Sequence, residues 1–486
     1  MSSRRDRISS RRPAGASITR STSTILILLT CGVRLVSCDA RAETLASALS
    51  RAYLGNPDLN QQRANVIARD EDVPKAAGGM RPKLNASVNG GGQFNRLRQP
   101  AGRDRNNARV YSGEQVMGEP HGAALGVTQP LFDGWRTDNS IRQAEAGVFA
   151  AQATMRLTEQ ATLQNGATAY MNVFRDKAVL SLKKNNLAVL EAQLRVARDR
   201  HRLGDVTFTD VAQAQAALAR AQTEHYAAQA TLQASAANYR QIIGVEPERL
   251  EPASTVENLL PTSLDEAISI AVVEHPGVVA ATRQVDAAEF GVKVGEGALL
   301  PSVSANIQVN QQYDSFYGIP GTRQFSAQAS GTINVPIYQG GVEYASIRQA
   351  KAQLGQARFN VDVQRDSVRA SVVSSFGQLA TAKSSIASAQ RGVKAAQVAL
   401  KGARDEAELG QRTTLDVLNA EQALLNARVD LISAQRDRVV ASYAALGAIG
   451  RLSAERLGLE TPIYDPNVHF EESRSKWIGL ASPIEK

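Results

Sequence analysis

Ser140-Ile141-Arg142-Gln143-Ala144 recurs unchanged as Ser346-Ile347-Arg348-Gln349-Ala350, 206 residues further along the chain. At the same spacing, Gln129-Pro130-Leu131-Phe132-Asp133-Gly134 faces Val335-Pro336-Ile337-Tyr338-Gln339-Gly340. Self-similarity at one fixed spacing indicates an internal repeat. The chain of 486 residues is therefore a tandem duplication, and its two copies are expected to share one fold.

The spacing between the copies changes once along the chain. Near their starts it is 219 residues, as Asn56-Pro57 and His275-Pro276 show, and it becomes 206 beyond Pro82 and Pro301. The first copy therefore holds thirteen additional residues. Residues 95–120, rich in Gly, Asn and Arg, are predicted to form this longer, exposed loop.

A period of two marks the strands of each copy. Apolar and polar side chains alternate strictly over 302–310 and 325–335, and more weakly in the first copy. This alternation predicts β-hairpins at about 83–132 and about 302–338. Runs of about ten such residues are typical of membrane-barrel strands, with an ordinary soluble hairpin as the alternative. Four strands per chain cannot close a barrel, since about eight are needed, so a barrel requires an oligomer.

Very long helices are predicted between the hairpins. Residues 134–203 and 340–409 contain no proline, and each run would extend for about 100 Å as a helix. Apolar residues recur every seven positions, in the first copy at Val173, Leu180, Leu187 and Leu194. A sustained seven-residue period predicts left-handed supercoiling against neighbouring helices. Half-length helices are expected near 44–77, 209–243, 263–297 and 415–449.

The first 42 residues resemble an export signal. An arginine-rich start precedes an apolar run over 25–36, and Ala40-Arg41-Ala42 offers small residues to a signal peptidase, with lipidation of Cys38 as the alternative. The segment carries +6 of the net charge of +8 and both cysteines, Cys31 and Cys38. Without it, nucleic-acid binding loses its main support and no thiol remains for a disulfide.

Together these patterns predict five parts of the chain. They are a signal peptide over 1–42, a first repeat over 43–250, a linker over 251–262, a second repeat over 263–451 and a C-terminal equatorial tail over 452–486. The five histidines are scattered, and the chain has neither a phosphate-binding loop nor a nucleophile elbow. The sequence therefore predicts no catalytic residue, metal ligand or cofactor.

The order and spacing of several motifs resemble the TolC family of outer-membrane efflux and secretion channels. They include the duplication, the junctions at 130–134 and 336–340, and the turns Leu203-Gly204 and Leu409-Gly410, each followed by Asp-Val. The tail, with Tyr464-Asp465-Pro466, His469 and Lys476-Trp477-Ile478-Gly479-Leu480, resembles the type I secretion branch of that family.

This resemblance implies an α+β fold. A trimeric outer-membrane β-barrel, with four strands per chain, would continue into a long α-helical coiled-coil tunnel in the periplasm. The assembly would be an exit duct that passively conducts cargo received from an inner-membrane ABC or RND-type transporter through a periplasmic adaptor (membrane fusion) protein. Outer-membrane lipid would surround it, and the cargo, whether protein, polysaccharide or small toxic compounds, stays open. The alternative is a periplasmic coiled-coil adaptor or scaffold protein without a barrel.

The resemblance also places a gate at the turns between helices. Asp416 occupies the position of a carboxylate ring at the narrowest point, and Asn419 replaces a second acidic ring one turn further on. Arg412 corresponds to a residue that ties adjacent helices together, with Asp210 as its expected partner, whereas Ala407 replaces a partner tyrosine. Alternatively, both aspartates only cap the return helices.

The two turns are the expected tips of the helical hairpins. Adaptor docking is assigned to Leu203, Gly204, Leu409 and Gly410. Glycine lets the chain reverse direction between two helices, so simple turn chemistry is the alternative for all four residues.

Overall fold

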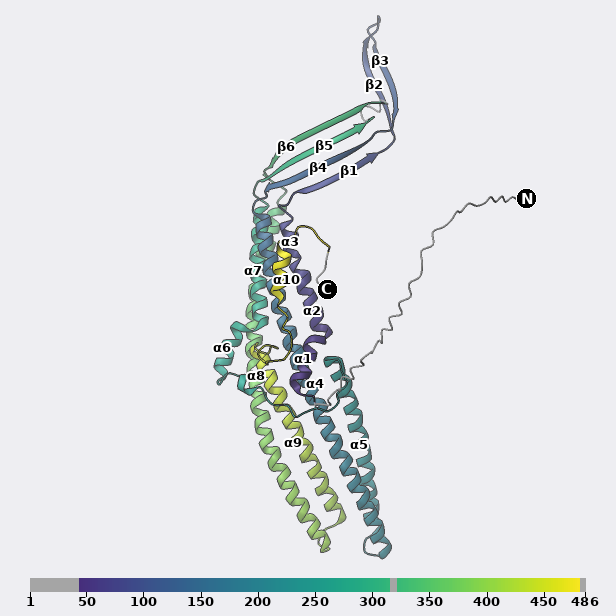
Figure 1. The fold of residues 1–486 in the computed structure, drawn as a ribbon, viewed down its shortest axis with the longest axis vertical. Helices are drawn as coiled ribbons and strands as arrows, with labels where there is room; N and C mark the ends of the chain where they lie inside the picture. The colour runs from purple at the N-terminus through teal and green to yellow at the C-terminus, as the bar shows by residue number, and fades with distance from the viewer. Residues whose placement is uncertain (1–42, 315–320, 481–486) are drawn as a thin grey trace, which may run out of the picture. The chain divides into compact units, whose positions relative to one another are not determined.

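The computed structural model describes residues 43–314 and 321–480. The predicted signal peptide, with Cys31 and Cys38, lies outside the described residues. Each copy runs from short helices through antiparallel strands to one long helix and its shorter return helix, and the first copy contains more strands than the second (Figure 1). The helices are α1 (Leu45–Gly55), α2 (Pro57–Asp70), α3 (Asp72–Ala77), α4 (Arg136–Leu203) and α5 (Phe208–Ile243), then α6 (Leu264–Glu274), α7 (Pro276–Gly297), α8 (Val342–Glu408), α9 (Thr414–Ile449) and α10 (Pro466–Arg474).

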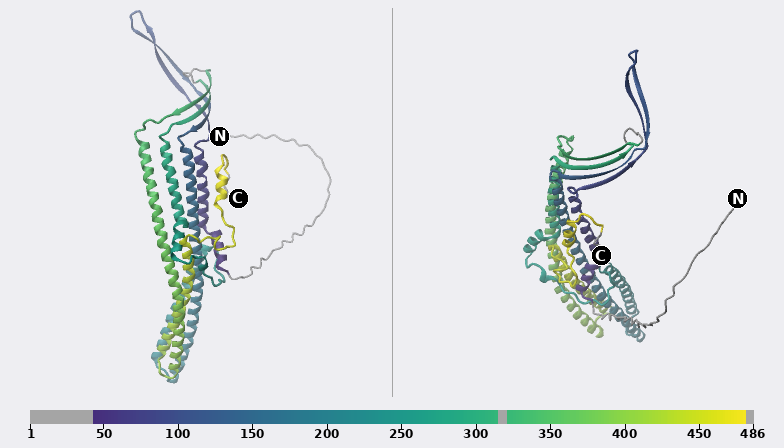
Figure 2. Two further views of the ribbon diagram at one scale, coloured as in Figure 1. Left: turned by 90° about the vertical axis from the view of Figure 1, so that its left-hand side faces the viewer. Right: turned by 45° about the horizontal axis from the view of Figure 1, so that its top comes forward.

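The long helices are confirmed. Helices α4 and α8 contain 68 and 67 residues, and their return partners α5 and α9 contain 36 residues each. Helix α4 packs against α5 of its own copy and against α7 and α9 of the second copy, while α8 packs against α9 and α7 (Figure 2). The contact between α4 and α9 is called the α4–α9 seam. Within the described part of the chain, no helix combines the length and the apolar character needed to cross a membrane.

The opening helices differ from the prediction because each is interrupted. Asn56 and His275 both adopt extended backbone before a proline, so α1 and α6 end there. A proline disfavours the helical conformation of the residue that precedes it and suits the first turn of a helix. The Asn56 side chain accepts from the N–H of Asp58 and of Leu59, and His275 Nδ1 accepts from the N–H of Gly277. These side chains start α2 and α7.

One four-stranded antiparallel sheet joins the copies in the order β1-β4-β5-β6. Its strands are β1 (Lys83–Gly90), β4 (His121–Phe132), β5 (Ser302–Tyr313) and β6 (Arg323–Asn334). The register pairs apolar with apolar residues, for example Leu125 with Val309 and Val303 with Ile333. The predicted alternation is therefore confirmed, and one face of the sheet is apolar. Exposed on it are Leu84, Val88, Leu125, Ile307, Phe325 and Ile333.

The loop predicted over 95–120 is wrong. Strands β2 (Gln93–Arg103) and β3 (Arg109–Gly118) pair there as a separate antiparallel ribbon. At its tip the Asp104 carboxylate accepts from the N–H of Asn106 and of Ala108, and Asn107 has a φ of 62°. Both faces of the ribbon are largely exposed, so its strands need no apolar alternation and the sequence carried no period-two signal.

The main core lies around the middle of α4, where α1, α5, α9 and the linker meet. Tyr170 and Tyr239 are fully buried there, with ring centroids 6.4 Å apart. The Tyr170 hydroxyl lies 2.6 Å from the carbonyl oxygen of Glu43 and 2.8 Å from that of Glu251. This side chain therefore holds the start of the first copy and the start of the linker against α4.

Candidate gate at the tips of the two helical hairpins

Each hairpin reverses direction at a glycine with left-handed backbone. Gly204 ends α4 at a φ of 87°, and Gly410 lies between α8 and α9 at a φ of 74°. Side chains other than glycine rarely adopt this conformation, which ends helices at low cost. The preceding leucines project from the tips, with Leu203 78% and Leu409 74% exposed. The structure thus places all four residues assigned to adaptor docking at the two tips.

Asp210 and Asp416 both take part in the caps of the return helices. Asp210 Oδ2 accepts from the N–H and hydroxyl of Thr207, at 3.0 and 2.7 Å, and Thr207 Oγ1 accepts in turn from the N–H of Asp210. Asp416 and Thr413 repeat this reciprocal arrangement at 3.1 and 2.8 Å. These hydrogen bonds hold the pKa of both carboxyls below the ordinary value. Two carboxylates therefore stay charged at the tips.

The expected pair between Arg412 and Asp210 is not formed within the chain. The Arg412 guanidinium instead binds the carboxylate of Glu406, in the last turns of α8, and this contact raises the pKa of the arginine. The glycine turn reverses the chain between the two residues and brings them together. The Thr414 side chain, at the start of α9, also helps to lower the pKa of Asp210, after the larger effect of Thr207. Asn419 lies exposed one turn beyond Asp416.

A groove of about 750 Å³ separates the two hairpins at their tips. Asp210 and Arg412 line it from opposite hairpins. Its lining also includes the apolar Val189 and Val196 from α4 and Leu418 from α9, together with the charged Arg200, Arg404 and Glu408. The groove thus contains charged residues that sequence comparison singled out, although these two do not pair across it.

Above the groove, a buried carboxylate joins three helices, and the sequence reasoning missed it. Glu421 Oε1 accepts from Gln193 Nε2 of α4 and from Arg404 Nη2 of α8, both at 2.6 Å. Only 7% of Glu421 is exposed, and its Oε2 has no hydrogen-bond partner among the described residues. We call these three residues the seam clamp. The sequence did contain a signal for it. Glu421 lies three residues after Leu418 and three before Leu424, on the face of α9 that these leucines bury, where a charged residue is unusual.

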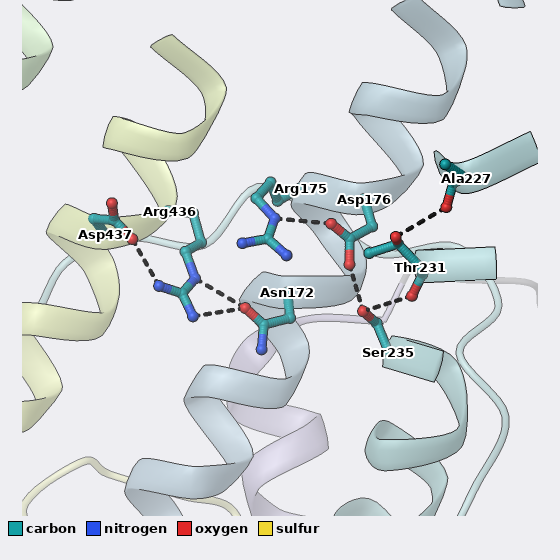
Figure 3. Close-up of polar contacts among 8 residues, drawn as sticks. All are labelled: Asn172, Arg175, Asp176, Ala227, Thr231, Ser235, Arg436 and Asp437. Atoms are coloured by element: carbon teal, nitrogen blue, oxygen red, sulfur yellow. Dashed lines mark hydrogen bonds and ion pairs between the residues drawn. The ribbon is translucent and has the colours of Figure 1, made fainter. Parts of the chain in front are cut away.

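A second polar cluster bridges the same seam further from the tips (Figure 3). Arg436 of α9 donates from Nε and Nη2 to Asn172 Oδ1 of α4, at 2.9 and 2.7 Å. On the other side of α4, the buried Asp176 accepts from Arg175 at 2.8 Å and from the hydroxyl of Ser235 on α5. The α4–α9 seam is therefore fixed by polar contacts at two levels.

The C-terminal tail is anchored by another buried pair. His469 Nδ1 of α10 lies 2.7 Å from Asp70 Oδ2 of α2, and both side chains are almost fully buried. Burial raises the pKa of Asp70, against the lowering effect of its contact with His469. This pair lies far along the chain from the tips and fixes the tail to the first copy.

Comparisons with family models, with curated proteins and with solved structures all indicate the same family. The model of the family described as outer membrane efflux protein matches residues 48–245 and 267–451. The chain is 40% identical over 456 residues to the outer membrane efflux protein BepC of Brucella suis, which covers 94% of this chain and 96% of that protein. It is 25% identical over 435 residues to the outer membrane protein TolC of Escherichia coli, covering 86% and 84%. The solved CmeC outer membrane channel of Campylobacter jejuni shares the fold, with a TM-score of 0.73 at 16% identity over 89% of each chain.

Proposed function

Because the chain belongs to the outer membrane efflux protein family, we propose that three copies of it form one duct that works with a periplasmic adaptor and an inner-membrane transporter. The protein itself is an outer-membrane channel of tripartite efflux or secretion systems, and it extends into the periplasm. It is a transport protein and not an enzyme. The alternative of an adaptor or scaffold is therefore wrong.

The unpaired edge strands of the four-stranded sheet are the main support for a trimer. Within the described residues, β1 pairs only with β4, and β6 pairs only with β5. Unpaired strand edges and an exposed apolar face are both costly in a free chain. Neighbouring copies would pair β6 of one chain with β1 of the next, so that three copies give a closed sheet of twelve strands around a lumen.

The long helices give independent support for neighbours on the open flanks. Helix α8 exposes Phe359, Val363, Val373 and Val398 along its length. Apolar residues repeated along an exposed helix face indicate a missing packing partner. In a ring of three copies, the flank of α8 would meet α5 of the next chain.

Fractionation tests this assembly. Expected is a heat-modifiable oligomer recovered in outer membranes, which becomes a monomer only after boiling in detergent. A soluble periplasmic monomer would refute it. A deletion strain would then show which exports fail, and so reveal the class of cargo that the duct conducts.

The gate is proposed at the tips of the hairpins, with Asp416 as a ring of three carboxylates that attracts cations. Its charge and its position at the turn support the role, and capping of α9 is compatible with it. Asn419 would leave the ring with less charge than two acidic rings. Asp210 and Arg412, on opposite sides of the tip groove, would face partners in neighbouring chains when the tips converge.

Arg412 offers the direct test of the gate. Arg412→Ser is expected to raise single-channel conductance in planar bilayers, because the tip of α8–α9 loses its link to Glu406. The first-copy residue at the same repeat position, Val206, supplies the matched control Val206→Ser. Equal conductance of the Arg412→Ser variant and the unaltered protein would reject the closing role.

Adaptor docking is proposed at the exposed leucines of the two tips. Leu203 and Leu409 present apolar side chains beside glycine turns, and isolated exposed leucines at a helix end provide contact area for another helical protein. Leu203→Ser together with Leu409→Ser is expected to abolish export while the oligomer still forms. Export at the normal rate in this double variant would remove the tips from the docking surface.

A further inference from the structure

We propose that the β2–β3 ribbon is a docking surface for the phosphorylated headgroups of a lipid surface. The ribbon comprises Gln93–Arg103 and Arg109–Gly118 with the turn between them. It belongs to the first copy only, and its role is separate from conduction through the duct.

The path of the chain places the ribbon at the outer end of the sheet. Strand β1 starts after α3 and β4 leads into α4, so the helices lie at one end of these strands. Their other ends, at Gly90 and His121, are joined by β2 and β3 (Figure 1). Because the helices extend into the periplasm, the ribbon lies on the external side of the outer membrane.

The ribbon is strongly basic. It contains Arg96, Arg98, Arg103, Arg105 and Arg109, all exposed, against only Asp104 and Glu114. The Asp104 carboxylate is engaged by the N–H groups of the turn. None of the five arginines forms an ion pair with a carboxylate of residues 43–314 or 321–480. Arg103 donates to Asn107 Oδ1 and Arg98 lies over the ring of Tyr111, and neither contact neutralises the charge of the arginine.

The pairing register sets two of these charges against each other. Arg103 lies directly opposite Arg109, and Arg105 follows in the turn. Like charges opposite one another destabilise a strand pair. A phosphate between the two guanidinium groups would turn this repulsion into two charge-assisted hydrogen bonds, and arginine binds phosphate in a bidentate manner.

Apolar side chains beneath the arginines favour a lipid surface over a soluble anion. Phe94 and Met117 are opposite in register near the sheet, and they are 60% and 77% exposed. Arg96 and Arg98 follow on the same strand face, roughly 7 and 13 Å further out at about 3.3 Å per residue. Apolar groups inside and cationic groups outside match the depth order of acyl chains and headgroups in a bilayer.

The second copy lacks this feature. Its connection between β5 and β6 spans only residues 314–322, and the sole charged residue within it is Asp314. The thirteen extra residues of the first copy therefore coincide with the basic, membrane-facing composition. A connection that only had to link two strands would need neither the extra length nor the arginines.

Lipid binding by the full chain purified in detergent tests the proposal. The protein is titrated with phosphatidic acid or with phosphatidylcholine in mixed micelles, and bound lipid is counted by native mass spectrometry. Replacing Arg103, Arg105 and Arg109 together with serine is expected to weaken phosphatidic acid binding by roughly tenfold or more at low salt, since each arginine near an anionic surface contributes favourably. Phosphatidylcholine binding should not change.

A matched variant controls for net charge. Arg195, Arg198 and Arg428 are exposed arginines of the helices, and replacing all three with serine removes the same charge. Equal loss of phosphatidic acid binding in this variant would overturn the proposal. So would full competition by inorganic phosphate at the same phosphate concentration, because that result identifies a soluble-anion site. Phe94→Ser with Met117→Ser should weaken phosphatidic acid binding, and an unchanged affinity would exclude a lipid surface.

Discussion

The two helical hairpins, α4–α5 and α8–α9, have nearly the same lengths, the same glycine turn and the same Thr-Asp cap. They differ at residues that bind other parts of the chain. Glu421 of the seam clamp corresponds to the exposed Gln215, and the buried Tyr170 corresponds to Phe376. Residues shared by the copies build each hairpin, whereas the residues that differ fix the hairpins to each other and to the linker.

Removing Glu421 should give the largest difference between the copies. Glu421→Ala leaves Gln193 and the Arg404 guanidinium without their shared acceptor at the seam. Loss of one partner of a buried ion pair costs several kcal/mol, and because about half of Arg404 is exposed we expect a smaller loss, about 1–3 kcal/mol. Amide hydrogen exchange in the halves of α4 and α9 nearer the tips measures this loss of stability.

Gln215→Ala is the matched control, since this residue holds the same place in the first copy and is exposed. Its exchange should stay within about 0.5 kcal/mol of the unaltered protein. If both variants loosened α4 and α9 equally, the seam clamp would not be what distinguishes the copies.

Exchanging the aromatic pair should produce the next largest effect. Tyr170→Phe removes the hydroxyl that contacts the carbonyl oxygens of Glu43 and Glu251. We expect the unfolding free energy to fall by about 0.5–1.5 kcal/mol, because the Glu43 carbonyl oxygen keeps its hydrogen bond from the N–H of Glu251. Burial of this hydroxyl raises the pKa of Tyr170 to about 12, so the donor keeps its proton at all working pH values. Denaturant unfolding followed by circular dichroism provides the measurement.

The converse change, Phe376→Tyr, tests whether a tyrosine hydroxyl is stabilising at this position of either copy or only in the first. Phe376→Tyr should have little effect, because Phe376 is only partly buried and an added hydroxyl can reach water. A gain in stability as large as the loss in Tyr170→Phe would mean that the added hydroxyl finds equivalent acceptors at position 376, contrary to the structure.

Much of this asymmetry was beyond the reach of sequence patterns. The repeat, the strand alternation and the proline-free runs predicted the sheet and the long helices, because each rests on a period within one element. The β2–β3 ribbon has no such period, and the clamp joins Gln193 to Glu421, which are far apart in sequence. Arg412 was identified by resemblance, but its partner Glu406 depends on how the turn closes. Contacts between elements require the assembled fold.

The smallest expected effect is that of acid on the mobility of the two tips, and it should be the same in both copies. The carboxyls of Asp210 and Asp416 have pKa values below the ordinary 3.8 because their threonine partners donate to the charged form. Their contribution to stability is present above that value and is lost as the pH falls through the lowered pKa. A spin label on Gln411→Cys, or at the matching Asp205→Cys, should gain mobility only as the pH falls below the ordinary carboxyl value of 3.8. Asp416→Asn should make the Gln411 label insensitive to pH. Retained pH dependence in that variant would assign the change to another group, and a difference between the tips would show that their caps are not equivalent.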